Sequence, residues 1–438
     1  MGILKRLKAR QSRLGEAPIA IIGAGYVARG VVHTLFRAPG MRPAIIVNRT
    51  TEHAVAIYES LGILRQQIVI SNEKSSLTAA ISAGKPCVAE SFEALDDLPI
   101  ELVVEATGAL DYGTRAILAS LDAGRHVVSF NAEVDSLLGW QFHQRAKAND
   151  VIYTIADGDQ PGVLLRLAEQ VESMGFEVRT MLNCKRYLNV LQNPSSGAGY
   201  ASRDTTSSHM TTAFGDGTKM QVEQAVVANA TGMVPDKRGM WGMETSQEKL
   251  IDDLPEALID GSKVDYTLGG DFGAGVGVVA RHEDVHLHKK SLALYKMGDG
   301  PDYFFFRPYH LVHLELPMTI ADVLLDNEPL SEITEPHAVE VVAITKKTLS
   351  ASEKLDGIGG YSAYGHIDRY MDAFEFLPIG LSEFATTTEP LPEGEAIPLT
   401  SVSLDDTKEV VRQWRSQRQH WAKLREKSAR ELEVQCTA

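Results

Sequence analysis

The stretch Ile19-Ala20-Ile21-Ile22-Gly23-Ala24-Gly25-Tyr26-Val27-Ala28 decides the fold expected of this chain. An apolar β run leads directly into a Gly-x-Gly-x-x-Ala turn, and an amphipathic segment follows. In such a turn the first glycine makes the tight bend and the second lets the backbone approach a pyrophosphate. The helix N-terminus then directs free N–H groups at the anion. The stretch predicts a dinucleotide-binding site with Gly23, Gly25, Tyr26 and Val27 at the phosphates; the alternative is a glycine-rich turn of an unrelated α/β protein.

The end of the second predicted strand indicates which dinucleotide is bound. That strand, residues 44–47, is followed by Asn48, Arg49 and Thr50. An NAD site usually places Asp or Glu here, on the ribose 2′-hydroxyl. A guanidinium instead forms charge-assisted hydrogen bonds with a 2′-phosphate, which a carboxylate would repel. These residues favour NADP(H) over NAD(H); the alternative for Arg49 is a solvated charge at a strand end.

Strands and helices alternate through the first third of the chain, which predicts a doubly wound parallel sheet, a Rossmann domain spanning residues 1–156. In such sheets ligands lie beyond the carboxyl ends of the strands. Thr107 and Gly108 follow one apolar run, and Asn131 follows the next. We therefore expect these three residues to border the same crevice as the glycine turn, although Thr-Gly and Asn are also ordinary turn residues.

The pattern changes twice in the remainder of the chain. Residues 157–335 mix strands and helices and predict an α+β catalytic or dimerisation domain. Residues 336–404 carry short strands separated by Pro and Gly, which predicts an all-β domain. Residues 405–438 are charged and helix-prone, and Trp414 and Trp421 fall on one helical face. This pattern is typical of a docking helix rather than a binding site.

Charge and cysteine usage restrict the partners and the compartment. The formal net charge of −15 disfavours nucleic acid and anionic membranes, whose proteins bind through Lys and Arg. The three cysteines are odd in number and far apart, so they favour a reducing cytoplasm over a disulfide framework or a zinc site. No apolar run is long enough to span a bilayer. The basic segment Met1–Arg13 lacks the apolar core of a signal peptide and predicts a short helix packed on the first domain or on a partner subunit.

Several longer segments resemble a known family. They are Ala156-Asp157-Gly158-Asp159-Gln160-Pro161, Asp216-Gly217-Thr218-Lys219, Ala228-Asn229-Ala230-Thr231-Gly232, Arg307-Pro308-Tyr309-His310 and Leu355-Asp356-Gly357-Ile358-Gly359-Gly360-Tyr361. Together they resemble the oxidoreductases related to homoserine dehydrogenase that carry a C-terminal SAF domain, one branch of which is deoxyxylulose-5-phosphate reductoisomerase-like. The resemblance covers roughly residues 17–404. It implies a homo-oligomer, because related dehydrogenases associate through the middle domain.

Three functions stay open at this stage. The resemblance implies an NADPH-dependent enzyme that converts 1-deoxy-D-xylulose 5-phosphate to 2-C-methyl-D-erythritol 4-phosphate. The first alternative is an NAD(P)-dependent dehydrogenase of another small polyol, a sugar acid or an amino-acid semialdehyde, as in homoserine dehydrogenase. The second alternative is a non-catalytic NADP(H)-sensing or scaffold protein.

The chemistry of hydride transfer selects the catalytic candidates. Transfer to or from carbon makes or consumes an alkoxide, which a cation stabilises and a positioned acid or base protonates. Related homoserine dehydrogenases use a Lys and an Asp on the segment that Asp216-Gly217-Thr218-Lys219 resembles. We expect Lys219, with a pKa lowered by desolvation, to polarise the reacting oxygen and relay its proton. Asp216 would orient the substrate hydroxyl or Lys219, and Glu223 would support them one helical turn further on. The alternative is a capped helix start with a solvated Lys–Glu pair.

The remaining candidates concern a small phosphorylated or carboxylated substrate. Lys185 and Arg186 follow a predicted strand and suit a phosphate or carboxylate, with Arg offering a bidentate grip. The alternative is that neither side chain binds a ligand, and that one buries its aliphatic part while the other keeps its charged end in solvent. Lys185 is also counted among the catalytic candidates, with Lys219, Asp216 and Glu223. Further substrate-binding candidates come from the segments named above: Asp157, Asp159, Gln160, Asn229, Arg307 and His310. Asp157 has the alternative role of capping the helix that follows.

Metal ligands are not predicted. Neither the set His310, His313 and Glu315 nor the histidines between residues 282 and 288 has a recognised ligand spacing, which favours structural histidines. A divalent ion that bridges a carboxylate and a substrate phosphate is nevertheless compatible with reductoisomerase chemistry.

Overall fold

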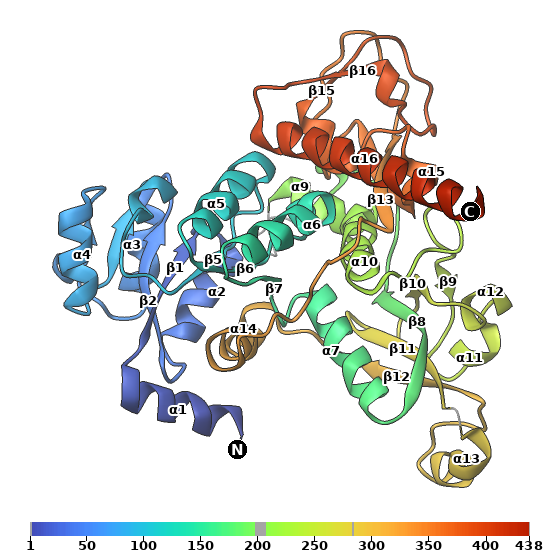
Figure 1. Ribbon diagram of the computed structural model, residues 1–438, viewed down its shortest axis with the longest axis horizontal. Coiled ribbons are helices and arrows are strands. Elements are labelled where there is room, and N and C mark those ends of the chain that lie inside the picture. The colour runs from blue at the N-terminus through green and yellow to red at the C-terminus, as the bar shows by residue number, and fades with distance from the viewer. Residues whose placement is uncertain (1, 198–206, 283, 438) are drawn as a thin grey trace.

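A seven-stranded parallel sheet forms the N-terminal part of the chain (Figure 1). The computed structural model describes residues 2–197, 207–282 and 284–437. The strands, in spatial order, are β3 (Val69–Ile70), β4 (Cys87–Ala89), β2 (Met41–Val47), β1 (Ala17–Ile22), β5 (Leu102–Glu105), β6 (His126–Ser129) and β7 (Tyr153–Ile155). The connecting helices are α2 (Tyr26–Leu35), α3 (Thr51–Glu59), α4 (Lys74–Ser82), α5 (Leu110–Asp122) and α6 (Ala132–Ala148).

This arrangement confirms the predicted α/β class. The central strands are continuous apolar runs because both faces of a parallel sheet are covered by helices. The chain builds outward from β1 to β2 and then returns to place β5 on the other side of β1. This reversal creates the crevice at the carboxyl ends of the strands where open α/β sheets bind ligands.

A second, mixed sheet follows in the middle of the chain. Its strands, in spatial order, are β12 (Asp302–Arg307), β11 (Val276–His282), β8 (Phe176–Lys185), β10 (Lys263–Leu268) and β9 (Met243–Glu244). The helices of this region are α7 (Gln160–Ser173), α9 (Ser208–Gly215), α10 (Thr218–Thr231), α11 (Leu250–Asp253), α12 (Glu256–Ile259), α13 (Val285–Leu294) and α14 (Val312–Ala321). α7 and α10 pack against strands of this sheet through one apolar cluster, and α11 and α12 through another.

The C-terminal region contains β elements, as predicted. Two antiparallel pairs are formed by β13 (Val339–Thr345) with β14 (Ala363–Arg369), and by β15 (Ala385–Thr387) with β16 (Val402–Leu404). The short helix α15 (Tyr370–Ala373) and the long helix α16 (Glu409–Thr437) complete the region. Trp414 and Trp421 are buried on one side of α16, which confirms that this helix docks on the rest of the chain.

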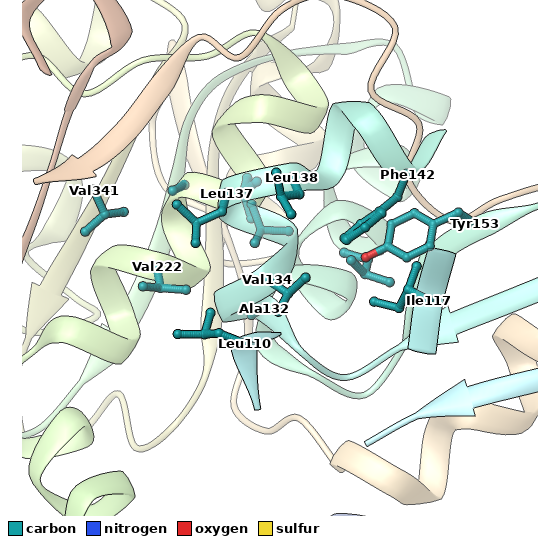
Figure 2. Packing of buried hydrophobic residues seen from close by; sticks show 14 of the residues in the cluster. Leu110, Ile117, Ala132, Val134, Leu137, Leu138, Phe142, Tyr153, Val222 and Val341 are labelled. Carbon is teal, nitrogen blue, oxygen red and sulfur yellow. The ribbon is translucent and has the colours of Figure 1, made fainter. Parts of the chain in front are cut away.

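One continuous apolar core joins the three regions. Figure 2 shows Tyr153 and Ile117 of the first region, Leu137 of α6, Val222 of α10 and Val341 of β13 in the same cluster. α10 lies at its centre, in contact with α6, α7, α9, β10, β13 and β14 (Figure 1). All twelve residues from Thr218 to Asn229 are buried. This helix therefore has no solvent-facing side over most of its length.

The N-terminal helix lies on the first region. α1 (Ile3–Leu14) buries Leu7 in the apolar cluster beside the parallel sheet, and Arg6 forms an ion pair with Asp326. α14 also returns to this sheet, where it packs against α2. The domain boundary predicted at residue 157 stays a prediction. A segment far beyond this boundary, α14, contributes side chains to the apolar core of the first region. No helix within the described ranges is long and apolar enough to cross a membrane.

Candidate functional site

The glycine turn leaves a helix N-terminus uncapped at the crevice. The Gly23 N–H donates to the Val47 carbonyl at 2.8 Å, which fixes the start of the turn from β1 to α2 against the end of β2. α2 then begins at Tyr26, and no side chain caps it. Gly25 and Tyr26 are exposed, while Val27 is partly buried against the neighbouring core. An uncapped helix start beside exposed glycine backbone is suited to an anion such as a pyrophosphate.

The predicted ribose-binding residues lie at the end of β2. The Asn48 N–H donates to the Ala89 carbonyl at 2.9 Å, and its side-chain amide donates to the Thr50 carbonyl at 2.8 Å. Arg49 and Thr50 are exposed. Among the described residues, Arg49 has no ion-pair or hydrogen-bond partner for its side chain. Its guanidinium is therefore available to a ligand.

The far wall of the crevice is held by a buried carboxyl group. Glu105, the last residue of β5, accepts a hydrogen bond from the Thr107 N–H at 2.9 Å and another from the Thr107 hydroxyl. Asn131 caps α6 by accepting from the Val134 N–H, and its amide donates to the Ala109 carbonyl at 3.3 Å. Burial raises the pKa of Glu105. Thr107 and Asn131 thus use their side chains to shape the wall.

A buried cluster of charges surrounds Lys219. The Lys219 ammonium contacts the Glu133 carboxylate at 2.8 Å, and the two side chains are only 8% and 7% exposed. Burial lowers the pKa of Lys219, but the carboxylates of Glu133, Asp159 and Glu223 outweigh burial, and the net pKa lies above its ordinary value. The expected lowering of this pKa is therefore wrong, because desolvation acts here together with three negative charges. A solvated Lys219–Glu223 pair is also excluded, since both residues are buried.

Glu223 joins two further candidates to the cluster. Its carboxylate accepts from the Asn183 amide at 2.9 Å and pairs with Lys185 at 3.4 Å. Burial raises the pKa of Glu223, but Lys185 and Lys219 outweigh it and hold that pKa below its usual value. Burial keeps the pKa of Asp159 above its usual value, although Lys219 opposes this effect. The cluster thus combines a persistent ammonium with one carboxyl that binds its proton more tightly than usual.

His310 reaches the same cluster from the segment after β12. Its Nδ1–H donates to the Gly158 carbonyl at 3.1 Å, and its charge acts on both Asp159 and Glu223. Gln160 starts α7 beside Asp159 and is fully buried, and neither polar atom of its amide has a partner among the described residues. Such an amide is costly to leave unpaired, which is consistent with a role toward a bound molecule.

Other candidates lie outside the Lys219 cluster. Asp216 pairs with Lys346 at 2.7 Å and accepts from the Thr218 N–H, so it anchors the start of α10 and does not contact Lys219. Asn229 accepts from the N–H groups of residues 338 and 339 and thereby holds β13.

Two of the remaining three candidates have local ion-pair partners, and the third is exposed. Asp157 pairs with Arg166 at 3.2 Å and does not cap α7, whose N-cap residue is Asp159. Arg307 forms an ion pair with Glu315. Arg186 is exposed just after β8.

Glu133 and Lys346 were not foreseen by the sequence analysis. Glu133 comes two residues after Asn131, so the rule that ligands gather at strand ends could have identified it. Lys346 lies 130 positions from Asp216 and nothing in the local sequence links the two. No group of three or more His, Cys, Asp or Glu side chains suited to a metal ion occurs among the residues that the structure describes.

Comparison with known proteins identifies the class of enzyme. Residues 158–316 match a family model described as the catalytic domain of oxidoreductase DRL. This span contains Asp159, Lys185, Lys219, Glu223 and His310. The prediction of an oxidoreductase is thereby confirmed. With its Rossmann sheet and open glycine turn, the chain is an NAD(P)-dependent oxidoreductase.

Solved structures with a similar fold include the following three proteins. One is scyllo-inositol dehydrogenase from Lactobacillus casei with bound NAD(H) and scyllo-inositol, at 12% identity, covering 73% of this chain and 92% of that chain with a TM-score of 0.42. Another is a probable dehydrogenase from Thermotoga maritima, at 11% identity, covering 71% and 90% with a TM-score of 0.42. GenD2 from gentamicin A biosynthesis, in complex with NAD, has 13% identity and covers 72% and 88% with a TM-score of 0.38. No curated protein matches the chain.

Proposed function

We propose that this oxidoreductase transfers a hydride between NADP(H) and an oxygen-bearing carbon of a small hydroxylated substrate, with Lys219 holding the reacting oxygen. The observation that carries the proposal is the buried Lys219 ammonium, which three carboxyl groups keep protonated. It belongs to a helix whose neighbours include α6, which begins at the carboxyl edge of the Rossmann sheet. A preorganised cation at this edge stabilises the negative charge that develops on oxygen during hydride transfer.

Proton movement follows from the charges of the cluster. The bound coenzyme supplies or accepts the hydride. In the direction of reduction, the Lys219 N–H gives its proton to the substrate oxygen as that oxygen becomes negative. Asp159 is the carboxyl group proposed to exchange protons with Lys219, because burial raises its pKa and its charge acts on Lys219. Glu133 accepts a hydrogen bond from the ammonium, and Glu223 acts on it electrostatically. His310 donates to the carbonyl of Gly158, next to Asp159. In the direction of oxidation, the same proton passes from the substrate hydroxyl to the cluster.

The preference for NADP(H) over NAD(H) rests on Arg49. Its exposed guanidinium follows β2, where a 2′-phosphate would lie, and no carboxylate is present among residues 48–50. Neutralising this charge by Arg49→Ser is expected to raise the KM for NADPH about tenfold and to leave the KM for NADH nearly unchanged. Arg29→Ser, at another exposed arginine of the same region, is the control. Equal effects of Arg49→Ser on both coenzymes would contradict this preference.

The compartment and the assembly are further parts of the proposal. Cys87 and Cys184 are buried free thiols, which suits a reducing cytoplasm. The homo-oligomer is proposed from the family resemblance alone, and light scattering of the purified protein measures it directly.

The proposed function is tested by assaying a panel of substrates, with turnover measured as the change in coenzyme absorbance. The panel contains neutral polyols, sugar acids, amino-acid semialdehydes and 1-deoxy-D-xylulose 5-phosphate. Lys219→Met should lower kcat/KM about 10³-fold while the Kd of NADPH stays the same, because the ammonium acts on developing charge. Lys85→Met, at an exposed lysine, should behave as wild type. Full activity of Lys219→Met would overturn the assigned role.

The second candidate function is the reductoisomerase. The observation that favours it is the match of residues 158–316 to the DRL catalytic-domain family. In this case NADPH oxidation would depend on 1-deoxy-D-xylulose 5-phosphate, and mass analysis would show a rearranged carbon skeleton. Simple reduction of the ketone without rearrangement, or no turnover of this compound, would remove this candidate and leave the dehydrogenase proposal in place.

A further inference from the structure

The C-terminal region forms one wall of a cavity next to the Lys219 cluster. The cavity has a volume of about 420 Å³. The residues that line it include Gly108 and Glu133, the partner of Lys219. Asp356 and Glu383, which follow more than 220 residues later in the chain, also line it. The cavity therefore connects the reacting centre with a region whose role the sequence leaves open.

The loop above this cavity is built to stay in place. Gly357 adopts a φ of +82°, and a Cβ there would come within 2.9 Å of the Glu383 side chain. Gly359 adopts a φ of +71°, and a Cβ there would meet the His209 carbonyl at 2.0 Å. The Asp356 carboxylate accepts from two N–H groups later in the loop, at 2.7 and 3.0 Å. Lys346 donates to the Gly360 carbonyl at 2.8 Å. Close packing and these three hydrogen bonds make this loop a fixed wall.

The described residues that line this cavity include acidic side chains but no Lys or Arg. Glu133, Asp356 and Glu383 line the cavity together with His209. A phosphate or carboxylate group would be repelled by Asp356 and Glu383, whereas the charge of Glu133 is balanced by Lys219. Hydroxyl groups of a neutral polyol instead donate hydrogen bonds to carboxylate oxygens without an electrostatic penalty.

Glu383 is the carboxyl group of this wall that is free to bind. Asp356 is engaged by its own loop, and Glu133 by Lys219. Glu383 is partly buried and has no hydrogen-bond or ion-pair partner among the described residues. Burial raises the pKa of Glu383 and Asp111 raises it further, while Lys354 and Lys408 act in the opposite direction without reversing the shift. A half-buried carboxyl group without a partner is unfavourable unless a bound molecule satisfies it.

We propose that this cavity receives the polyol end of a neutral hydroxylated substrate, and that Glu383 determines specificity by accepting hydrogen bonds from its hydroxyl groups. The inference rests on the proposed function and names the substrate class of that site. It also assigns the C-terminal region a direct part in substrate recognition. A phosphate monoester of the same polyol is predicted to be a poorer substrate than the free polyol.

The experiment compares linear and cyclic polyols, each with its phosphate monoester, in the full-length protein with saturating NADP⁺. Wild type should turn over a free polyol with higher kcat/KM than the matched ester. Glu383→Leu should raise the KM for the polyol about tenfold with little change in kcat, because one charge-assisted hydrogen bond is lost. Glu383→Gln keeps an acceptor oxygen and should restore part of the affinity. Glu393→Leu, at an exposed carboxyl of the same region, is the control.

The outcomes separate this inference from the proposed function. The Kd of NADPH should be the same for all three variants, and thermal shifts with polyols confirm binding independently of turnover. A phosphate ester preferred over its free polyol, or a KM for Glu383→Leu equal to that of Glu393→Leu, would overturn the inference. The inference would also be overturned if the protein bound coenzyme but no free polyol gave turnover or a thermal shift. That result would leave the oxidoreductase class intact. Loss of coenzyme binding in wild type would instead refute the proposed function.

Discussion

At the scale of single residues, the electrostatics of Lys219 decide what the site is able to do. A buried lysine alone would lose its proton readily, because burial disfavours the charged form. Here the carboxylates of Glu133, Asp159 and Glu223 reverse that tendency. In the proposed reaction Lys219 therefore begins each cycle as a proton donor and an electrostatic partner for oxygen, and the base needed for alcohol oxidation belongs to the cluster as a whole.

Removal of Glu133 tests this balance. Glu133→Gln deletes the carboxylate closest to Lys219, so the pKa of Lys219 should fall. The alkaline limb of the kcat profile should move to lower pH, and kcat/KM at neutral pH should drop about tenfold, within the range that acid–base catalysis contributes. Glu59→Gln, at an exposed carboxyl of the first region, should leave the profile unchanged. An unchanged alkaline limb for Glu133→Gln would show that this carboxylate does not control the protonation of Lys219.

Several of the residue-level predictions rest on short local motifs. The glycine turn, Arg49 and Lys219 belong to short motifs, and the structure places each beside the crevice or the charge cluster. Their binding roles remain predictions. The partner of Lys219 was not foreseen because it is 86 positions away, on another helix. The spacing of residues along the chain indicates which residue types form a site. The partners in an ion pair instead depend on how helices pack against each other, which local spacing does not reveal.

At the scale of elements, α10 is the support of the site. Its residues Thr218 and Gln221 accept hydrogen bonds from the N–H groups of Gly365 and Ile367 in β14, at 2.9 Å each. Just before the helix, Asp216 pairs with Lys346, and the side chains are 0% and 3% exposed. Lys346 also donates to the Gln192 carbonyl at 2.7 Å. The start of α10 is thereby fixed from two sides.

Breaking this buried pair from one side should be costly. Lys346→Met leaves the Asp216 charge buried without its partner, which is expected to lower the free energy of unfolding by about 3–5 kcal/mol. The double variant Lys346→Met/Asp216→Asn should recover at least half of that loss, because the amide oxygen still accepts from the Thr218 N–H. Urea unfolding measures both. Lys347→Met, at an exposed pair, should cost less than about 1 kcal/mol. Equal losses for the single and double variants would argue against the ion pair as the cause.

Element prediction was accurate for long segments and weaker for short ones. α16 was identified by its charged composition and its tryptophan face, and the strands β1, β2 and β5 by their apolar runs. The strands β3 and β4 contain two and three residues, too few for a periodic pattern. Such short strands form because neighbouring strands offer hydrogen bonds, and their own sequence contains no comparable signal.

At the scale of the whole molecule, the C-terminal region is part of the same core as α10, the helix that carries Lys219. β13 and β14 pack on α10, and α16 packs on α5 and α6 of the first region. The loop of residues 355–361 closes the cavity beside Glu133. A region that reads in sequence as an appended β domain thus supports the site physically. The sequence could not reveal this, because the contacts join segments more than 100 residues apart.

The pH dependence of folding reports on this assembly through Glu340. This residue of β13 is 5% exposed. Burial raises its pKa from 4.5 to about 8, despite a hydrogen bond from the Val341 N–H and the charge of Arg418 on α16. Between these two pKa values the folded chain holds a proton that the unfolded chain has released. Stability contributed by the protonated carboxyl is therefore complete below pH 4.5 and is lost as the pH rises to about 8.

Glu340→Gln should remove this loss, because the amide is neutral at every pH. We expect the free energy of unfolding of wild type to fall more steeply between pH 5 and pH 8, by up to about 1.4 kcal/mol per pH unit, than that of the variant. Asp135 and Asp265, whose pKa values burial raises to about 7 and about 6, contribute equally to both proteins. Glu335→Gln, at an exposed carboxyl, should keep the wild-type slope. Parallel curves for wild type and Glu340→Gln would mean that Glu340 is ionised in the folded chain, and that β13 and α16 admit water between them.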